Sequence, residues 1–230
     1  MFSLEDLGRA ITTRRSYRLP YDPIDVSEEE IRACLDLARW APSAHNAQPW
    51  RFVAFYRQNS MHQEIRQAIA ESMAARFEAD LLGDDMDPDQ ARQAALASIQ
   101  RYTSAPVLII VCMDESVLAK YVDEQRIVIE GVMGEQSVAA AITLFLVALE
   151  ACGLQACWQC APLFCPVVVK EAIGLPEAWQ PQAFILVGHG QVSNPIGGPL
   201  LQKHGRMPGT ARHPVDEILF SPESFREDAP

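Results

Sequence analysis

The chain lacks several patterns that define common functional classes. Its 230 residues contain no Gly-x-Ser-x-Gly, no phosphate-binding P-loop and no His-Glu-x-x-His motif, so hydrolase, kinase and metalloprotease functions have no support. Positive charge is scarce, because 19 Lys and Arg residues face 30 Asp and Glu residues, for a formal net charge of -11. Since nucleic-acid affinity depends on accumulated cations, this balance argues against a nucleic-acid-binding protein.

Long hydrophobic segments are also absent. The longest uncharged apolar stretch, Val138–Leu149, would span roughly 18 Å as a helix, short of the ~30 Å of a bilayer core. We interpret it as a buried helix and expect no membrane partner. The first residues show no basic region followed by an apolar stretch, which is the pattern of a secretory signal. We therefore expect a cytoplasmic protein that forms one domain over residues 1–230.

The six cysteines do not form a disulfide framework in this context, and we expect reduced thiols. Cys157 and Cys160 have the two-residue gap of metal and redox motifs. No second pair and no nearby histidine completes a tetrahedral ligand set, so we predict no metal site. A thiol-dependent redox role for Cys157 and Cys160 stays open as an alternative.

Hydrophobic periodicity and local breakers predict an alternation of helices and strands. Capping boxes begin at Ser3 and Ser27, and a continuous apolar run at 107–112 indicates a strand buried on both faces. Helices are predicted over 3–12, 27–41, 60–80, 88–102, 130–152 and 166–174, and strands over 50–55, 107–112, 154–158 and 183–187. The long helix from 130 is apolar around most of its circumference, so we expect it to be enclosed on nearly every side.

Two regions do not fit a simple core. Residues 60–104 form two helical patterns separated by an acidic, turn-rich break, and we interpret them as a lid or excursion. Residues 189–230 contain several prolines and glycines with little periodicity. This composition predicts an extended arm that needs another surface to lie on.

A short basic segment and a polar loop carry the chemistry. Residues 14–18, Arg-Arg-Ser-Tyr-Arg, place three cations and a hydroxyl within five positions of an acidic chain. Arginine forks match phosphate oxygens two at a time, which favours an anion site over an ordinary basic helix end. Residues 42–48, enclosed by Trp40 and Trp50, add amides and a hydroxyl that can satisfy a ring system. Together they predict a site for a phosphorylated, oxygen-rich ligand.

This pair of segments resembles the opening of the nitroreductase-type FMN oxidoreductases. The most specific motifs are Arg-Arg-Ser-x-Arg at 14–18 and Pro-Ser-x-x-Asn-x-Gln-Pro-Trp at 42–50, and the resemblance extends to about Arg206. Residues 153–158 and 174–179 look most similar to the flavoprotein domain attached to some deazaflavin-coenzyme γ-glutamyl ligases. The resemblance implies an α+β, three-layer fold whose central, mostly antiparallel sheet is flanked by helices, with an extended C-terminal arm.

The resemblance also implies a cofactor site between two subunits. Arg14, Ser16 and Arg206 would contact the flavin phosphate and ribityl chain, and Arg18 the pyrimidine edge. Pro42, Ser43 and Asn46 would come from the partner subunit. The full set of implied FMN-binding residues is Arg14, Arg15, Ser16, Arg18, Pro42, Ser43, Ala44, Asn46, Gln48, Trp158, Gln159, Cys160, Ala161 and Arg206. Ala44 stands where many members have a second Ser, so a hydroxyl contact is lost there. Cys160 and Ala161 replace a Glu-Gly pair common in the family, and backbone N–H groups at Gln159–Ala161 would contact the flavin in place of side chains.

These observations lead to one main functional hypothesis. The protein would be an FMN-dependent oxidoreductase in which NADH or NADPH reduces the flavin and an electron-poor small molecule reoxidises it. The chemistry would be carried by FMN, with Arg18 as electrostatic support and no side-chain acid or base. The active unit would be a homodimer. A deazaflavin-coenzyme reductase, or a non-catalytic flavin- or thiol-dependent redox protein, are the alternatives.

Overall fold

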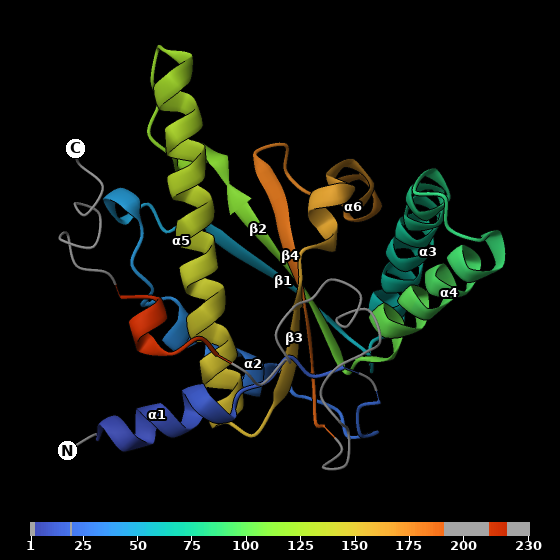
Figure 1. Cartoon of the computed structure of the whole chain (residues 1–230), viewed down its shortest axis with the longest axis horizontal. Coiled ribbons are helices and arrows are strands. Elements are labelled where there is room, and N and C mark those ends of the chain that lie inside the picture. The colour runs from blue at the N-terminus through green and yellow to red at the C-terminus, as the bar shows by residue number, and fades with distance from the viewer. Residues whose placement is uncertain (1–2, 19, 191–211, 220–230) are drawn as a thin grey trace, which may run out of the picture. The chain divides into compact units, whose positions relative to one another are not determined.

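The computed structural model describes residues 3–18, 20–190 and 212–219, and the chain divides into two compact units, 1–194 and 195–230. The first unit is an α+β fold around a four-stranded sheet in the order β1-β2-β4-β3 (Figure 1). The strands are β1 (Trp50–Tyr56), β2 (Val107–Asp114), β3 (Gln155–Gln159) and β4 (Trp179–Gly188). All three strand pairings are antiparallel, as predicted. In this order β1 and β3 form the two edges of the sheet.

Strand β2 is central because its sequence can be buried on both faces. All eight of its residues are buried, and its predicted core 107–112 is confirmed. Strand β4 lies beside it and begins at Trp179, four residues before the predicted start. A register shift between Val111 and Cys112 leaves Gln182 without a partner, and the ladder then continues with Pro181 opposite Cys112.

One face of the sheet is covered by α2 (Glu28–Ala38) and α5 (Glu124–Ala151), which share a hydrophobic core with it (Figure 1). The predicted capping box of α2 is present, since Ser27 accepts from the Glu30 N–H at 3.2 Å and the Glu30 carboxylate accepts from the Ser27 N–H at 2.8 Å. Ile31, Cys34 and Ala38 form the buried stripe of α2. This spacing puts one side of the helix against α5.

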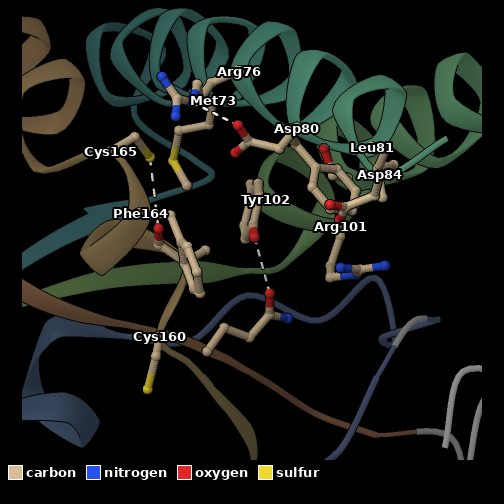
Figure 2. Close-up of a pocket in the computed structure, with 14 residues that line it drawn as sticks. Met73, Arg76, Asp80, Leu81, Asp84, Arg101, Tyr102, Cys160, Phe164 and Cys165 are labelled. Atoms are coloured by element: carbon tan, nitrogen blue, oxygen red, sulfur yellow. Dashed lines mark hydrogen bonds and ion pairs between the residues drawn. The ribbon is translucent and has the colours of Figure 1, made fainter. Parts of the chain in front are cut away.

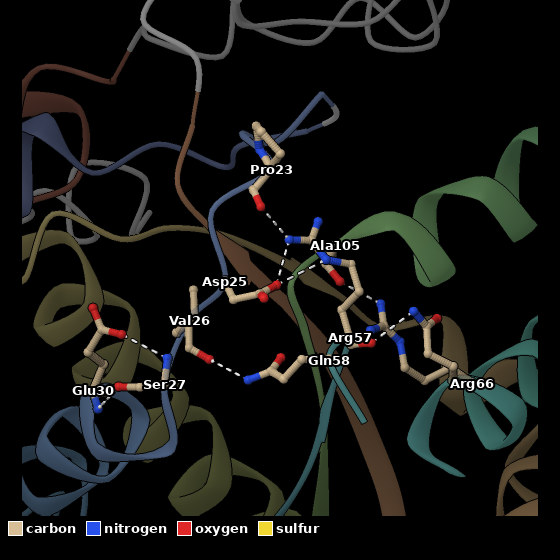
Figure 3. A network of polar contacts seen from close by, with 10 residues as sticks. Pro23, Asp25, Val26, Ser27, Glu30, Arg57, Gln58, Arg66 and Ala105 are labelled. Carbon is tan, nitrogen blue, oxygen red and sulfur yellow. Dashed lines mark hydrogen bonds and ion pairs between the residues drawn. The ribbon is translucent and has the colours of Figure 1, made fainter. Parts of the chain in front are cut away.

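The other face carries α3 (Ser60–Gly83), α4 (Pro88–Ser104) and α6 (Pro166–Ile173) around a second core. Arg66 of α3 is fully buried, and its guanidinium donates to the Tyr102 carbonyl at 2.7 and 3.2 Å and to the Ala105 carbonyl at 2.7 Å (Figure 3). These carbonyls lie at the C-terminal end of α4, where a cation complements the helix dipole. Arg57 pairs with Asp25 at 2.7 Å nearby and ties the segment before α2 to the end of β1. The lid region 60–104 is therefore a helix pair anchored on its sheet side.

Helix α5 differs from its prediction in length and in burial. It begins at Glu124, with Asp123 as N-cap, and not at 130. The apolar pattern pointed to the later start because the first turns are mixed in polarity. Within one chain, Ile127, Val128 and Val132 are exposed, so the expectation of near-complete enclosure is wrong for a single subunit. By length and composition α5 could cross a membrane, but half of its most apolar window is buried, as in a core helix.

Helix α1 (Leu4–Thr13) presents an apolar stripe that one chain does not cover. Leu4, Leu7 and Ile11 lie at helical spacing, and all three are exposed. Ser3 caps the helix through the predicted capping box with Asp6. In the second unit, the described residues 212–219 contain a short 3-10 helix, Val215–Glu217. His213, which precedes this helix, contacts the Glu217 carboxylate at 2.8 Å.

Candidate functional site

The basic segment 14–18 lies along the free edge of β3. Helix α1 ends at Thr13, and Ser16 then forms a parallel bridge with Ala156. The Tyr17 N–H donates to the Ala156 carbonyl at 2.8 Å. Arg14 is half-buried, whereas Ser16 and Arg18 are exposed. The chain direction beyond α1 therefore places the predicted anion-binding residues next to the strand that leads into the turn at 159–161.

Arg15 has a structural partner at the end of α1. Its Nη1 donates to the Arg14 carbonyl at 2.7 Å and also to the Thr12 carbonyl. The last carbonyls of a helix have no partners within the helix, so this guanidinium satisfies two of them. Arg14 has no ion-pair partner in the described ranges of the chain. Of these two cations, Arg14 is the one available to an anionic ligand.

The turn after β3 directs neighbouring side chains to opposite faces of the sheet. Trp158 packs against the α5 side, where its indole Nε1 is buried and has no hydrogen-bond partner among the residues described. Gln159 faces α4, and its Oε1 accepts from the Tyr102 hydroxyl at 3.0 Å. Cys160 is exposed and Ala161 begins the 3-10 helix Ala161–Phe164. These four predicted residues follow Ala156, the β3 residue that contacts the basic segment, by two to five positions along the chain.

A cavity of about 440 Å³ opens beside this turn, between the helix pair α3–α4 and the segment after β3 (Figure 2). Its walls combine apolar side chains with charged groups at the α3 and α4 ends. It is lined by Met73, Arg76, Phe77, Asp80, Leu81, Asp84, Ser98, Arg101, Tyr102, Gln159, Cys160, Ala161, Phe164 and Cys165. Three of the predicted site residues, Gln159, Cys160 and Ala161, therefore border a pocket covered by the predicted lid.

Two titratable side chains that line this cavity, Tyr102 and Cys165, are buried, and burial favours their neutral forms. Burial raises the pKa of Tyr102 above its ordinary value, and burial likewise raises the pKa of the Cys165 thiol. Arg76 and Asp80 form an ion pair at 2.9 Å on α3, which balances their charges. The buried side chains of the lining therefore offer hydrogen bonds and apolar contact, and the charged side chains belong to the rest of the lining.

The polar loop 42–48 is held in an unusual backbone conformation. His45, Asn46 and Gln48 have φ values of 53°, 54° and 47°, in the left-handed region that side chains disfavour. The Ser43 hydroxyl accepts from the Gln48 N–H at 3.0 Å, and the Ser137 hydroxyl of α5 accepts from the Ala44 N–H at 3.2 Å. These bonds fix the loop on α5, with Pro42, Asn46 and Gln48 exposed.

The structure does not bring this loop to the basic segment within one chain. The loop leads into Trp50 at the start of edge strand β1, whereas the basic segment contacts Ala156 on the opposite edge strand β3. The registers place Ala156 level with Tyr56, at the far end of β1. Three strand spacings and six residues separate the two positions, a diagonal of about 25 Å. Arg206, the remaining predicted residue, lies outside the described ranges.

Sequence patterns did not single out Tyr102, Phe164 or Cys165 as site residues. Each lies in an ordinary helical or apolar context, and only the packing of α4 and of 161–164 around β3 brings them together. The thiol motif gains no metal partners, since no group of three His, Cys, Asp or Glu residues could hold an ion within the described ranges. Cys157 is buried and contacts the Gln159 amide at 3.8 Å.

Comparison with known proteins assigns this α+β fold to a family. Residues 11–189 match the model of the nitroreductase family, so the chain belongs to the nitroreductase family. A curated relative, 5,6-dimethylbenzimidazole synthase from Rhodospirillum rubrum, is 29% identical over 188 residues, which cover 80% of each chain.

Solved structures show the same fold. A nitroreductase-type protein from Desulfovibrio desulfuricans, solved in complex with FMN, is 25% identical, with a TM-score of 0.59 over 90% of this chain and 99% of that one. A protein from Clostridium acetobutylicum described as an NADH oxidase is 26% identical, with a TM-score of 0.55 over 80% of this chain and 89% of that one. The similarity therefore extends over most of the fold.

Proposed function

We propose that this protein is an FMN-dependent oxidoreductase that uses NADH or NADPH to reduce an electron-poor small molecule. The observation that carries the proposal is the placement of Arg14 and Ser16 beside β3, whose end leads into the turn and cavity at Gln159–Ala161. Membership of the nitroreductase family, the FMN complex of the Desulfovibrio protein and the NADH oxidase name of the Clostridium protein support the same chemistry.

The residues present fit an FMN site. The Trp158 Nε1 donor is buried and has no acceptor among the described residues. Because buried donors are almost always paired, an additional oxygen or nitrogen is expected next to it. Arg14 lacks an ion-pair partner in the described chain and suits a phosphate. The apolar walls of the cavity suit a planar ring system or an acceptor.

The protein's part in the reaction is binding, orientation and electrostatics. When bound, FMN supplies the two-electron redox chemistry. Arg14 and Ser16 would hold the phosphate and ribityl chain, joined by Arg206, and Arg18 would supply a fixed positive charge where negative charge develops. Backbone N–H groups at Gln159–Ala161 would orient the ring. The α3–α4 pair would exclude water from the cavity and select the acceptor.

We also propose that the active unit is a homodimer, because one chain leaves the site incomplete. The loop 42–48 and the segment 14–18 lie at opposite edges of the same sheet, so Pro42, Ser43 and Asn46 would reach the basic segment of a second copy. The uncovered apolar residues of α1 and of the first turns of α5 provide the surface that such a copy would bury. The free edge of β1, beside a groove lined by Phe52 and Tyr56, could receive the partner's arm.

The proposal is tested by the visible spectrum of the purified protein, followed by identification of the chromophore released on denaturation. We expect a flavin spectrum, FMN as the released species, anaerobic bleaching by NADH or NADPH, and parallel lines in double-reciprocal plots with a nitroaromatic acceptor. Flavin-free protein and free FMN are the controls. Colourless protein that fails to take up FMN and contains stoichiometric zinc would remove the flavin account in favour of a thiol or metal protein.

Two further candidates are separated by their products and donors. The Rhodospirillum rubrum relative favours a 5,6-dimethylbenzimidazole synthase, which mass spectrometry would detect as that product after aerobic incubation with FMN and NADH. A deazaflavin-coenzyme reductase, suggested by the sequence of 153–158 and 174–179, would turn over with a reduced deazaflavin and not with NADH or NADPH. Flavin bleaching without acceptor turnover would indicate a non-catalytic flavoprotein.

A further inference from the structure

Two cysteines that lie far apart in the sequence are in contact in the fold. The Cys34 thiol of α2 donates to the Cys152 sulfur at the end of α5, with the two Sγ atoms 3.6 Å apart and 118 positions between them in the chain. The other four cysteines, all in the described part of the chain, make no sulfur–sulfur hydrogen bond. This pair is therefore different in kind from the Cys157–Cys160 motif.

The two thiols differ in exposure, although both are held by regular structure. Cys34 is fully buried in the stripe that α2 packs against α5, together with Ala148 and Leu149 of that helix. Cys152 is exposed and forms the C-cap of α5, followed by Gly153 in the left-handed conformation that turns the chain toward β3. Closing the gap to a disulfide bond of about 2.05 Å needs a combined sulfur movement of about 1.5 Å.

We propose that Cys34 and Cys152 form a reversible, oxidisable dithiol, with a peroxide as the class of oxidant. The exposed Cys152 thiolate attacks one peroxide oxygen, the O–O bond breaks, and a sulfenic acid and hydroxide result. The Cys34 sulfur then attacks the Cys152 sulfur, the S–O bond breaks, and the departing hydroxide takes the Cys34 proton. Two thiols and one hydrogen peroxide thus yield one disulfide and two waters. The proposal does not depend on flavin chemistry.

The environment determines which thiol reacts first. Burial raises the pKa of Cys34 to about 12, and Cys152 and Glu30 add to the effect, so Cys34 is a neutral thiol at physiological pH. Of these two thiols, only Cys152 is exposed to an oxidant in solution.

The disulfide would connect the two elements that lead into the candidate site. Helix α2 continues into the loop 42–48, and Cys152 precedes the strand that ends at Gln159. A link across a long stretch of chain restricts the unfolded state, so the oxidised protein should resist denaturation more than the reduced one. Oxidation would therefore restrict the motion of α2 relative to the start of β3 without changing a residue of the candidate site.

The test uses the full-length protein as purified, treated with hydrogen peroxide after removal of reductant. Free thiols are then alkylated and the protein is digested without reduction. We expect titratable thiols to fall from six to four, a cross-linked peptide pair containing Cys34 and Cys152, and a shift of the urea midpoint to higher concentration. Dithiothreitol should reverse all three changes.

Variants make the assignment specific. Cys152→Ser changes an exposed position and should abolish the cross-linked peptide and the midpoint shift, whereas the matched exposed variant Cys160→Ser should retain both. Cys34→Ala removes the buried partner and should likewise abolish the cross-linked peptide and the midpoint shift. Six remaining thiols after peroxide, a link between other cysteines, or Cys152 oxidised only to sulfinic or sulfonic acid would overturn the proposal.

Discussion

At the scale of single residues, Arg51 is the side chain that joins the polar loop to the sheet. Its guanidinium pairs with Asp114 at 2.7 Å and donates to the Gln48 carbonyl at 3.0 Å, and it lies 5.9 Å from the centre of the Trp179 ring. Burial by itself would raise the pKa of Asp114, but hydrogen bonds from Ser116 and the charge of Arg51 hold it below its ordinary value. The carboxylate is therefore stabilised by the fold.

Replacing Asp114 with Asn should lower the free energy of unfolding at pH 7 by about 1.5–3 kcal/mol, the usual value of hydrogen bonds to a charged group. Because the folded pKa is depressed, this contribution is present above the unfolded pKa of about 3.9 and is lost as pH falls below it. Urea unfolding between pH 7 and pH 3 should thus show a gap between wild type and Asp114→Asn that narrows in acid. A gap that is constant with pH would contradict the assignment.

Arg14 carries the prediction for phosphate recognition. Arg14→Ala should weaken FMN binding about tenfold to over a hundredfold, because a lost charge-assisted contact is worth roughly 1.5–3 kcal/mol. Fluorescence titration of flavin-free protein with FMN measures the affinity. Arg9→Ala, which removes an exposed arginine from the same end of the chain, is the matched control and should bind FMN as wild type does. Equal affinities in all three proteins would remove phosphate recognition from Arg14.

At the scale of elements, the loop 42–48 is the part of the fold that combines backbone strain with exposed polar groups. Three of its residues have positive φ, and hydrogen bonds to Ser43 and Ser137 hold them there. Strain of this kind persists where the surrounding structure over-determines the conformation, often at ligand sites. In our proposal, this fixed conformation orients the polar groups of the loop toward the basic segment of a second subunit.

The strain itself can be measured at His45, which is exposed and has a φ of 53°. His45→Gly should raise the free energy of unfolding by about 1 kcal/mol, since glycine avoids the steric cost of the left-handed conformation. Ala47, in the same loop, has an ordinary helical φ of -66°. Ala47→Gly should therefore lower stability by about 0.4–1 kcal/mol. Chemical denaturation measures the free energy of unfolding of both variants. If both glycine substitutions lower it by a similar amount, His45 is not strained.

The helix pair α3–α4 lines the cavity, and in our proposal it controls access to it. Arg66 anchors it at the sheet end, whereas Phe77, Leu81 and Asp84 line the cavity farther along α3. One end of the helix pair is thus fixed to the sheet, and side chains farther along it are placed to contact an acceptor in the cavity. Acceptor choice should therefore depend on these α3 residues more than on the basic segment.

At the scale of the whole molecule, one chain exposes large apolar side chains on α1 and on the first turns of α5. Leu4 is 85% exposed, and Ile127, Val128 and Val132 lie uncovered on the first turns of α5. Among the described residues, no strand pairs with the outer edge of β1, which leaves backbone groups along that edge without a strand partner. A second copy that covers these features would bury well over ~2,000 Å² in total, the range of obligate dimers.

Truncation after Gly190 should cost both dimerisation and FMN, because it removes the arm together with Arg206. A matched protein that ends after residue 219 keeps Arg206 and should retain FMN. Light scattering and flavin absorbance on the two proteins provide the measurement. A monodisperse full-length monomer that holds FMN normally would defeat the dimer proposal.

Local sequence patterns determined most of the elements of this fold. The capping boxes at Ser3 and Ser27, the buried strand at 107–112 and the break between α3 and α4 follow from preferences that act within a few residues, and each is present in the structure. The motifs at 14–18 and 42–50 also led to the family. The local structural preferences and the family motifs both depend on residues that are close together in the sequence. They can therefore be recognised without knowledge of the tertiary structure.

Only the tertiary structure decided which of these elements meet. The order β1-β2-β4-β3, the hydrogen bond from Tyr102 to Gln159 and the contact of Cys34 with Cys152 join residues tens of positions or more apart. No local pattern encodes such pairs, since they depend on the register and packing of complete helices and strands. The separation of the loop 42–48 from the basic segment has the same origin. Sheet order sets it, and in our proposal a second copy of the chain overcomes it.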